Sequence, residues 1–415
     1  MLDINFIRQN PKLVEEGIKA KGMEVDVGKL LEVDDRRRKL LAEVENLRAQ
    51  RNKAAHDKDI EEGKELKEKI KKVEDELEKV NENFFDLILK VPNLPDDDAP
   101  KGKSEEENKV IKKWGNHPKF DFNPRDHLEL GESLDIIDVL RSVKISSSRF
   151  GSLKNTGALL EFALAGFALE ELVEEGFIPI VPPVLVNQKS MEGTGYLSYS
   201  GDLEVYHLEK DNLYLVGTAE QSIGPMHQDE IFQEKELPKR YTAFSSCFRR
   251  EAGSYGKDTR GIFRVHQFDK VEMFSFCLPK DSQKEHKFFL ELEEKLVQKL
   301  KLPYRVLDIY TADLGFVAAR KFDIECFLPS QGRFRETHST SNARDFQSRR
   351  LNIKYKDSKK TEFVHTVNGT AFAIGRMVIA ILENYQQKDG TVKIPDVLQK
   401  YIGIERISPK TSSRG

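Results

Sequence analysis

Apolar residues recur at alternating steps of three and four along two stretches near the start of the chain. In the first stretch they occupy Leu30, Val33, Leu40, Val44, Leu47 and Ala54, with Arg37 and Arg51 in two further slots. In the second stretch they occupy Leu66, Ile70, Val73, Leu77, Val80, Phe84, Leu87 and Val91. This spacing places the apolar side chains on one stripe of a helix, as in a coiled coil. The pattern therefore predicts two long helices with apolar seams.

The segment HDKDIEEG, which includes Gly63, separates the two stretches and is predicted to be the turn between them. Two helices of similar length joined by a short turn form an antiparallel hairpin, and each arm of roughly 27 residues would reach on the order of 40 Å. Long apolar seams also join subunits. The pattern leaves two roles open for residues 30–90, namely a projecting arm or a coiled-coil dimerisation element.

The hairpin pattern stops at VPNLPDDDAPKG, where prolines and consecutive aspartates predict a linker. We place the domain boundary between residues 98 and 99, and beyond it we expect mixed α and β structure. Helices are predicted over Thr156–Glu175, Gln283–Leu300 and Asn368–Tyr385. On the first of these, Leu159, Leu160, Ala163 and Phe167 are expected to share one face.

Strands are predicted over residues 177–186, 203–217 and 240–276. The first has the sequence FIPIVPPVLV, and its prolines suit a sheet edge or a bulge because proline cannot donate to a strand ladder.

Composition limits the classes of protein that fit. A length of 415 residues allows two or three domains, and a net charge of −3 gives no global nucleic-acid signature, so any basic patch must be local. No run approaches the length of an uncharged membrane span, and MLDINFIRQN lacks the apolar core of a signal peptide. The three cysteines form no CxxC pair and no zinc spacing, which fits a reducing compartment. We expect a cytoplasmic protein without a structural zinc or a membrane anchor.

Charge is densest in FRREAGSYGKDTRGIFRVHQFDKVE, which ends at Glu272. A nucleotide is the polyanion that would need such cations. The sequence has no GxxxxGK[ST] loop, so side chains would have to hold the phosphates, and the planar fork of arginine suits that task. If the stretch forms two strands joined by the loop AGSYGKDTRG, alternation places Arg249 and Glu251 on one face of the first strand. On the second strand it places on one face Arg264, His266, Phe268, Lys270 and Glu272.

Two interpretations of this stretch compete. A charged hairpin is commonly a solvated, salt-bridged surface. An aromatic ring and charges on the same face instead favour a binding site, in which Phe268 would stack on a base and Glu272 would accept a hydrogen bond from a hydroxyl or ammonium group.

The stretch resembles motif two of class II aminoacyl-tRNA synthetases, and more narrowly that of the bacterial seryl-tRNA synthetases. The resemblance extends over nearly the whole chain. GFIPIVPPVLV resembles motif one, GTAEQS resembles the amino-acid loop, and NGTAFAIGRMVIAILENYQ resembles motif three. The start MLDINFIRQNPKLV and the later strand FDIECFLPSQGRFRETHSTSN also resemble the family. Several independent motifs in the family's order make a chance match implausible.

The resemblance implies an α+β fold, in which helices flank the antiparallel β-sheet of class II synthetases and an antiparallel two-helix coiled-coil arm lies at the N-terminus. Residues 1–98 would be a tRNA-binding domain with the arm at about 30–90. Residues 99–415 would be the catalytic domain, with motifs one, two and three at about 176–186, 244–276 and 366–387. The implied activity is that of a homodimeric serine–tRNA ligase, which forms seryl-adenylate from ATP and L-serine and transfers serine to tRNA(Ser). Whether tRNA(Sec) is also charged stays open.

The resemblance also implies roles for individual residues. The catalytic residues would be Arg249, Glu272 and Arg376. Serine would be bound by Thr218, Ala219, Glu220, Arg249, Glu272, Asn368 and Thr370. ATP would be bound by Arg249, Arg250, Glu251, Arg264, Val265, Phe268, Glu336, Thr337, His338, Ser339 and Arg376. Mg²⁺ would be held by Glu336 and Ser339, because that ion prefers hard oxygen ligands. His338 is expected to point away from this metal pair.

In the family the arm grips tRNA, and the local charge agrees. Residues 30–55 carry seven Lys or Arg against five acids, whereas residues 61–90 carry seven against ten. The first helix is therefore the better nucleic-acid face, with Arg48 and Lys53 off the seam.

Two other functions are weighed against the ligase. A synthetase-like paralogue that loads a small amino acid onto a carrier protein would typically lack the long arm. A tRNA-binding or regulatory paralogue without catalysis would have lost phosphate-binding arginines or Glu336. The chain has the arm and every one of the matched positions.

Overall fold

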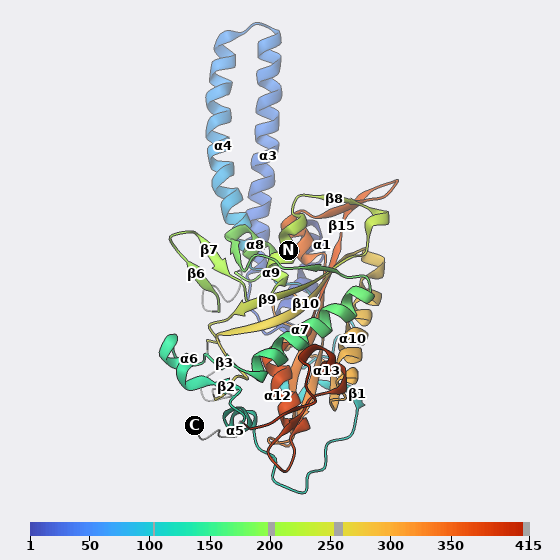
Figure 1. The fold of residues 1–415 in the computed structure, drawn as a ribbon. Coiled ribbons are helices and arrows are strands. Elements are labelled where there is room, and N and C mark those ends of the chain that lie inside the picture. The colour runs from blue at the N-terminus through green and yellow to red at the C-terminus, as the bar shows by residue number, and fades with distance from the viewer. Residues whose placement is uncertain (103, 198–203, 253–259, 410–415) are drawn as a thin grey trace. The chain divides into compact units, whose positions relative to one another are not determined.

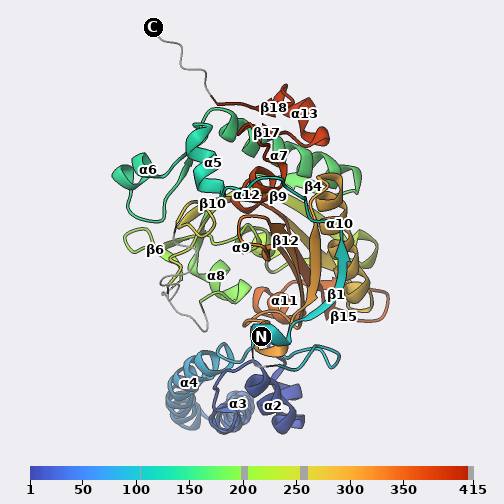
Figure 2. The ribbon, with the colours of Figure 1, turned by 90° about the horizontal axis from the view of Figure 1, so that it is seen from below.

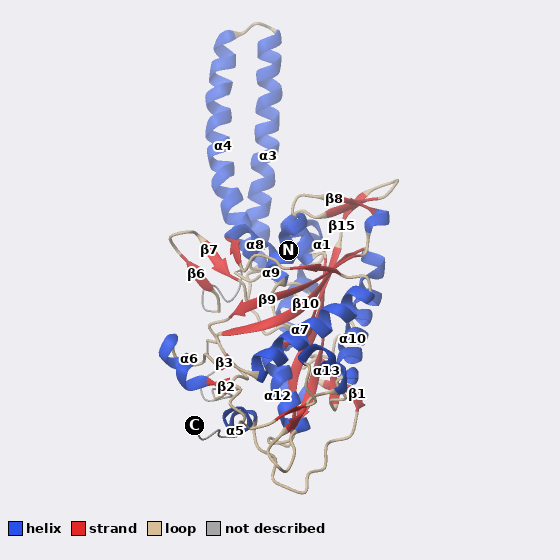
Figure 3. Cartoon of the chain, viewed as in Figure 1, coloured by secondary structure: helices blue, strands red, loops and turns tan. Residues whose placement is uncertain are grey.

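The structure is a computed structural model, and it describes residues 1–102, 104–197, 204–252 and 260–409 (Figures 1 and 3). Most of the predicted loop AGSYGKDTRG, including Gly253 and Gly256, lies outside the described residues. The chain forms two compact units, Met1–Leu94 and Pro95–Gly415. The division falls within the predicted linker, a few residues before the boundary placed from the sequence.

The first unit is helical and contains the predicted antiparallel hairpin, visible as the two long helices of Figure 1. Its helices are α1 (Ile4–Gln9), α2 (Pro11–Ala20), α3 (Val27–His56) and α4 (Ile60–Ile88). The seam between α3 and α4 buries Leu30, Val33, Leu40, Val44, Ala54, Leu66, Ile70 and Phe84. Arg37, which takes the place of an apolar residue in the seam, donates a hydrogen bond to Asn81. Its guanidinium lies 4.7 Å from the centre of the Phe84 ring. The periodic apolar pattern is thus satisfied within the hairpin itself.

The turn of the hairpin is shorter than predicted. The helix α4 begins at Ile60, so residues of the segment IEEG that we assigned to the turn are helical. The Asp59 side chain accepts a hydrogen bond from the backbone N–H of Glu62 over 2.9 Å and caps the helix. Acidic Glu61 and Glu62 in the first turn further favour this start, because the helix dipole is positive there.

Within the described ranges, the second unit is built on an eight-stranded sheet with the order β1-β11-β12-β13-β16-β10-β9-β4. Neighbouring strands run antiparallel, apart from β4, which runs parallel to β9. The strands are β1 (Lys109–Trp114), β4 (Ile178–Ile180), β9 (Lys239–Phe248), β10 (Gln267–Cys277), β11 (Tyr304–Asp308), β12 (Arg320–Leu328), β13 (Arg333–Arg344) and β16 (His365–Ala373). The predicted antiparallel α+β fold is confirmed, and the proline-containing β4 lies at the sheet edge as expected.

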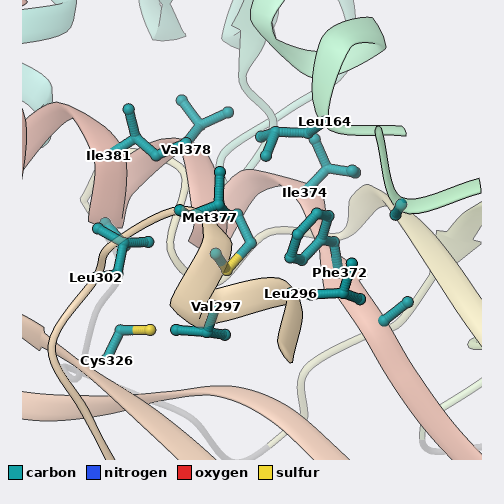
Figure 4. Packing of buried hydrophobic residues seen from close by; sticks show 14 of the residues in the cluster. Leu164, Leu296, Val297, Leu302, Cys326, Phe372, Ile374, Met377, Val378 and Ile381 are labelled. Carbon is teal, nitrogen blue, oxygen red and sulfur yellow. The ribbon is translucent and has the colours of Figure 1, made fainter. Parts of the chain in front are cut away.

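Helices cover one face of this sheet. They are α7 (Thr156–Glu174), α10 (Ser282–Lys299), α12 (Ile374–Tyr385) and α13 (Asp396–Ile402). Figure 4 shows Leu164 of α7, Leu296 of α10 and Met377 of α12 packed around Phe372 of the sheet. On β10, Val271 and Met273 point into this core, so the residues that alternate with them face the other side.

Shorter elements complete the unit, and α8 and α9 lie on the side of the strands away from the helical layer (Figure 2). The helices are α5 (His127–Ser133), α6 (Val139–Ile145), α8 (Gln188–Thr194), α9 (Glu220–Ile223) and α11 (Phe346–Leu351). The strands form small sheets and are β2 (Ile137–Asp138), β3 (Ser152–Leu153), β5 (Leu185–Asn187), β6 (Tyr206–Leu208), β7 (Leu213–Leu215), β8 (Ile231–Gln233), β14 (Lys354–Lys356), β15 (Thr361–Phe363), β17 (Val392–Lys393) and β18 (Arg406–Ile407).

Three local predictions were wrong. The helix expected from Asn368 begins only at Ile374, because the preceding residues pair with β10 as strand β16. Leu159 does not share the buried face of α7, since it is 54% exposed. Arg249 and Glu251 lie just past the end of β9, and Glu251 has a φ of 50°, which interrupts the extended conformation.

The cysteines agree with the sequence analysis. Cys247, Cys277 and Cys326 are free thiols and are buried. In the part of the chain that the structure describes, no helix combines the length and the apolar character that crossing a membrane requires.

Candidate active site

A cavity of about 280 Å³ is lined by residues of β10, β12, β13 and β16, of the start of α12 and of the segment that follows β9. Most of the residues predicted for the site line it. They are Thr218, Glu220, Arg249, Glu251, Arg264, Val265, Phe268, Glu272, Glu336, Thr337, His338, Ser339, Asn368, Thr370 and Arg376. The fold therefore brings residues from five separate segments of the sequence into one site.

Two predicted residues, Ala219 and Arg250, are not among the described residues that line the cavity. Ala219 is fully buried in an apolar cluster that contains Phe274. The Nε of Arg250 donates to the carbonyl of Val205 over 2.7 Å, and its guanidinium lies 4.9 Å from the Tyr206 ring. Their neighbours in sequence, Thr218, Glu220, Arg249 and Glu251, line the cavity instead.

Other lining residues were missed or given no role in the sequence analysis. They are Tyr196, Ile262, Phe263, Lys270, Lys321, Ser341, Ala373 and Gly375. Lys270 could have been singled out, since it alternates with Phe268 and Glu272 on the predicted charged face. Tyr196 and Lys321 carry no such local signal, because only the folded chain brings them to the cavity.

One part of the cavity is built around the carboxylate of Glu220, which is 3% exposed. It accepts hydrogen bonds from the Tyr196 hydroxyl over 2.7 Å, from the Gln347 amide over 2.6 Å and from the Asn368 amide over 3.0 Å. Burial raises the pKa of Glu220, while the hydrogen bonds from Tyr196 and Gln347 act against the rise. These donors hold the carboxylate in one orientation.

A second buried carboxylate, that of Glu272, lies beside Lys270. The Lys270 ammonium forms an ion pair with Oε2 of Glu272 and donates to Oγ1 of Thr218 over 2.8 Å. Burial raises the pKa of Glu272 to about 7, against the opposing effect of Lys270. Thr370 pairs with Glu272 across the two strands and also borders the cavity.

Arginines reach the cavity from three segments. The Nε of Arg249 donates to the carbonyl of Gly217 over 3.1 Å, and its guanidinium lies 5.3 Å from the Phe268 ring. Arg264 forms an ion pair with Glu251. Arg376 lies 3.0 Å from Oε1 of Glu336, and its guanidinium is 5.1 Å from the Phe263 ring.

The predicted metal pair offers oxygen ligands. The side chain of Glu336 is 48% exposed, and burial alone would raise its pKa, but Arg376, Lys321 and Arg249 outweigh burial and lower it. Ser339 lies opposite Asp323 in the pairing of β13 with β12. Within the described ranges no group of three or more His, Cys, Asp or Glu residues is arranged to hold a metal ion. Two oxygen ligands fit Mg²⁺, which commonly takes its remaining ligands from phosphates and water.

His338 is fully buried, and its ring lies edge-on to Phe372 at 5.8 Å. Burial lowers the pKa of His338 to about 3, so the imidazole is neutral. Its Nδ1 forms a hydrogen bond with the Thr337 hydroxyl over 2.8 Å.

Comparison with known proteins assigns both units. Residues 204–385 match the model of the tRNA synthetase class II core domain (G, H, P, S and T), and residues 1–95 match that of the seryl-tRNA synthetase N-terminal domain. The antiparallel sheet and its cavity are thus those of a class II aminoacyl-tRNA synthetase. The Serine--tRNA ligase of Dictyoglomus turgidum is 45% identical over 99% of this chain and 100% of its own length. That of Acidothermus cellulolyticus is 46% identical with the same coverage. The chain belongs to the seryl-tRNA synthetase family.

Two solved structures resemble the whole chain. Seryl-tRNA synthetase from Pyrococcus horikoshii, complexed with ATP, has a TM-score of 0.91 and 38% identity, and the match covers 99% of this chain and 100% of that one. Cytoplasmic serine-tRNA ligase from Naegleria fowleri, in complex with AMP, has a TM-score of 0.89 and 32% identity, with 99% of both chains covered.

Proposed function

We propose that this chain is a serine–tRNA ligase that forms seryl-adenylate from ATP and L-serine and transfers the serine to the 3′ end of tRNA(Ser). The observation that carries the proposal is that one part of the cavity is lined by arginines and another part by buried carboxylates. Arg249, Arg264 and Arg376 supply cations for a triphosphate, and the buried carboxylates of Glu220 and Glu272 supply acceptors for a small amino acid. It is supported by relatives named Serine--tRNA ligase that match along their whole length, and by a similar structure in complex with ATP.

The first step needs no general base. The carboxylate of serine is already ionised, and its oxygen attacks the α-phosphorus of ATP as pyrophosphate leaves. Arg249 would contact both the α-phosphate and the serine carboxylate, and Arg264 and Arg376 would hold the γ-phosphate end. Catalysis then consists of positioning and of stabilising the charge that develops on the phosphate.

The adenine would lie on the Phe268 ring, with its amino group donating to Glu251. Arg376 would cover the other side of the base, and the contact between Arg376 and Phe263 supports the guanidinium in that place. Arg250 keeps no side-chain role in this proposal, because its guanidinium is held on Val205 and Tyr206.

Serine would be selected by its ammonium and hydroxyl groups. Thr218 and Glu220 would hold the ammonium, and Asn368 supports this by donating to the Glu220 carboxylate. Glu272 and Thr370 would receive the hydroxyl. Alanine would leave those buried groups without a partner, which costs about 1–3 kcal/mol for each group.

Glu336 and Ser339 would hold Mg²⁺ against the ATP phosphates, as the oxygen ligands of the site allow. The ion, when bound, supplies positive charge that offsets the charge of the phosphates. The residues of the chain would contribute the Glu336 carboxylate, whose pKa nearby cations lower, and the Ser339 hydroxyl, which also borders the cavity.

The first unit would bind tRNA through its hairpin. The apolar seam is buried between α3 and α4 of one chain, which favours a projecting arm over a dimerisation element. Arg48 and Lys53 are exposed on α3, and Arg48 forms an ion pair with Glu74 over 2.7 Å that a phosphate could replace. An assay of serine transfer to tRNA(Sec) tests whether that tRNA is a second substrate.

A homodimer would form through a different surface of the second unit. Large apolar side chains are exposed on α6, on α7 and within the proposed motif one. They include Leu140 at 76%, Ile145 at 80%, Leu159 at 54%, Phe162 at 66% and Val181 at 85%. Clusters of this kind commonly mark an interface between proteins. An enzyme of this function with three free thiols would work in the cytoplasm.

ATP–pyrophosphate exchange with a panel of amino acids tests the proposal. Serine should drive exchange, with alanine and threonine far weaker. The Glu272→Ala variant should lose most serine-dependent exchange while it still binds ATP, and the Glu291→Ala variant, altered at an exposed position of α10, should match the unmodified protein.

The alternatives give different results in the same assay. Exchange driven best by another small amino acid, without transfer to tRNA, would indicate a carrier-loading paralogue. No exchange with any amino acid, together with tRNA binding, would indicate a protein without catalytic function.

A further inference from the structure

Lys270 is a buried cation to which the proposed chemistry assigns no role. It lies on β10, is 6% exposed, and alternates with Phe268 and Glu272 on the strand face that borders the cavity. Its ammonium contacts two groups proposed to bind serine, namely the Glu272 carboxylate and the Thr218 hydroxyl. A buried lysine is costly unless its charge is paired, so a specific use is expected.

We propose that Lys270 is a positioning residue for serine recognition, which keeps Glu272 as an ionised carboxylate so that this residue can accept the hydrogen bond of the serine hydroxyl. The inference rests on the proposed function, because it assigns Lys270 a task in selecting that substrate. Lys270 acts through Glu272 and need not touch serine.

The surroundings of Glu272 show why it needs such a partner. The carboxylate is 2% exposed, and water therefore does little to stabilise its charge. Glu220, from α9, adds a second negative charge that disfavours ionisation, whereas Arg249, past the end of β9, favours it. Of these neighbours, Lys270 has the strongest opposing effect on the raised pKa of Glu272.

Groups on other elements complete the environment. Glu293 approaches from α10 and is fully buried, and burial raises its pKa well above the ordinary value. The raised pKa disfavours the anionic form of Glu293, which weakens its competition with Glu272 for Lys270. Tyr196 and Cys247 also face this region, and burial raises the pKa of both, so they stay neutral. Lys270 is thus left to pair with Glu272.

Thr218 helps to fix the position of the Lys270 ammonium. Its Oγ1 accepts a hydrogen bond from Nζ of Lys270 over 2.8 Å. A lysine side chain is flexible, and a second partner of this kind reduces its freedom to swing away from Glu272. The pair is therefore held together by geometry as well as by charge.

The pH dependence of serine use separates this role from a purely structural one. With Lys270 present, Glu272 has a pKa of about 7, so kcat/KM for serine should rise as pH increases through about 7 and then level off. In Lys270→Met the carboxyl should ionise only at higher pH. A move of one pH unit or more would lower the ionised fraction on the order of tenfold at low pH, because each unit is a factor of ten.

The experiment compares the unmodified protein with Lys270→Met and with Lys280→Met, an exposed lysine that pairs with Glu234, by pyrophosphate exchange from pH 6 to 9. Lys270→Met should raise KM for serine about fivefold or more at pH 7, leave KM for ATP unchanged, and recover toward pH 9. Lys280→Met should behave as the unmodified protein. An unchanged KM for serine with an unchanged pH midpoint in Lys270→Met would overturn the inference.

A second pair of variants covers the case in which Lys270→Met does not fold. Glu272→Gln and Lys270→Met/Glu272→Gln should have the same KM for serine, because Lys270 acts only through the carboxylate. In neither variant should kcat/KM for serine rise as the pH increases through about 7. A further tenfold loss in the double variant would refute the role. If the unmodified protein does not activate serine, the proposed function itself fails, which this assay shows independently of any variant.

Discussion

Replacing Arg249 tests the proposed site most directly, because a matched control is the next residue in the chain. Arg249 lines the cavity, whereas the side chain of Arg250 is held outside it by Val205 and Tyr206. Arg249→Ala removes a planar donor that would contact the reacting phosphate. Loss of one donor to charge that develops in a transition state costs about 3–4 kcal/mol, or roughly 10²–10³ in rate.

Two other substitutions, Arg249→Lys and Arg250→Ala, should lower the exchange rate by smaller amounts. Arg249→Lys keeps the charge but loses the fork and its hydrogen bond to Gly217, so its rate should lie between those of the unmodified protein and Arg249→Ala. Arg250→Ala removes a hydrogen bond to a backbone carbonyl and should lower the rate only a few-fold.

The assay is serine-dependent ATP–pyrophosphate exchange with both substrates at saturation, followed by separate measurement of each KM. The expected order of rates is the unmodified protein, Arg250→Ala, Arg249→Lys and Arg249→Ala. A near-normal rate in Arg249→Ala, or equal losses in Arg249→Ala and Arg250→Ala, would refute the assignment of the cavity as the adenylation site.

Four further predictions concern other parts of the chain. Replacing Leu30 to Leu89 with a short flexible linker should leave serine-dependent exchange largely intact and lower transfer to tRNA by orders of magnitude; full-rate transfer would show that the arm is not the tRNA grip. Neutralising Arg48 and Lys53 should weaken tRNA binding more mildly and reduce its salt dependence, measured by titration at several salt concentrations. Phe162→Asp should convert the proposed dimer to a monomer in sedimentation, and an unchanged sedimentation coefficient would contradict the proposed interface. Burial and a neighbouring Asp269 raise the pKa of Glu161 to about 8, so the unfolded chain releases this proton at lower pH than the folded one. In urea unfolding, the free energy of unfolding of Glu161→Gln should therefore increase relative to that of the unmodified protein as pH rises from 5 to 8. A difference between the two proteins that does not depend on pH would contradict this.

The hairpin could be predicted because its signal is local. A seam such as Leu40 and Val44 repeats within one helix, and the same residues are buried in the structure. The start of α4 was missed because the cap formed by Asp59 depends on a single side chain and not on the apolar pattern. The start of α12 was missed for a different reason. Asn368 and its neighbours form a strand by pairing with β10, a contact between residues far apart in the sequence.

The site shows the same division between local and distant information. Most residues within the recognised motifs line the cavity, but a motif is a contiguous window, whereas neighbouring side chains point in different directions. Ala219 and Arg250 were therefore included although their side chains face away. Tyr196 and Lys321 were omitted because their positions depend on how distant segments pack. No local pattern identifies residues of this kind.

The hairpin has a consequence for how its length can change. The seam repeats every seven residues, and seven residues advance a helix by about 10 Å. Inserting one repeat into α3 and one into α4 would preserve the pairing of the seam and lengthen the arm by that amount. An insertion into α3 alone would offset every contact beyond it. Insertions and deletions in this part of the gene should therefore persist only as matched pairs, and the arm's length can vary without any change in the residues of the cavity.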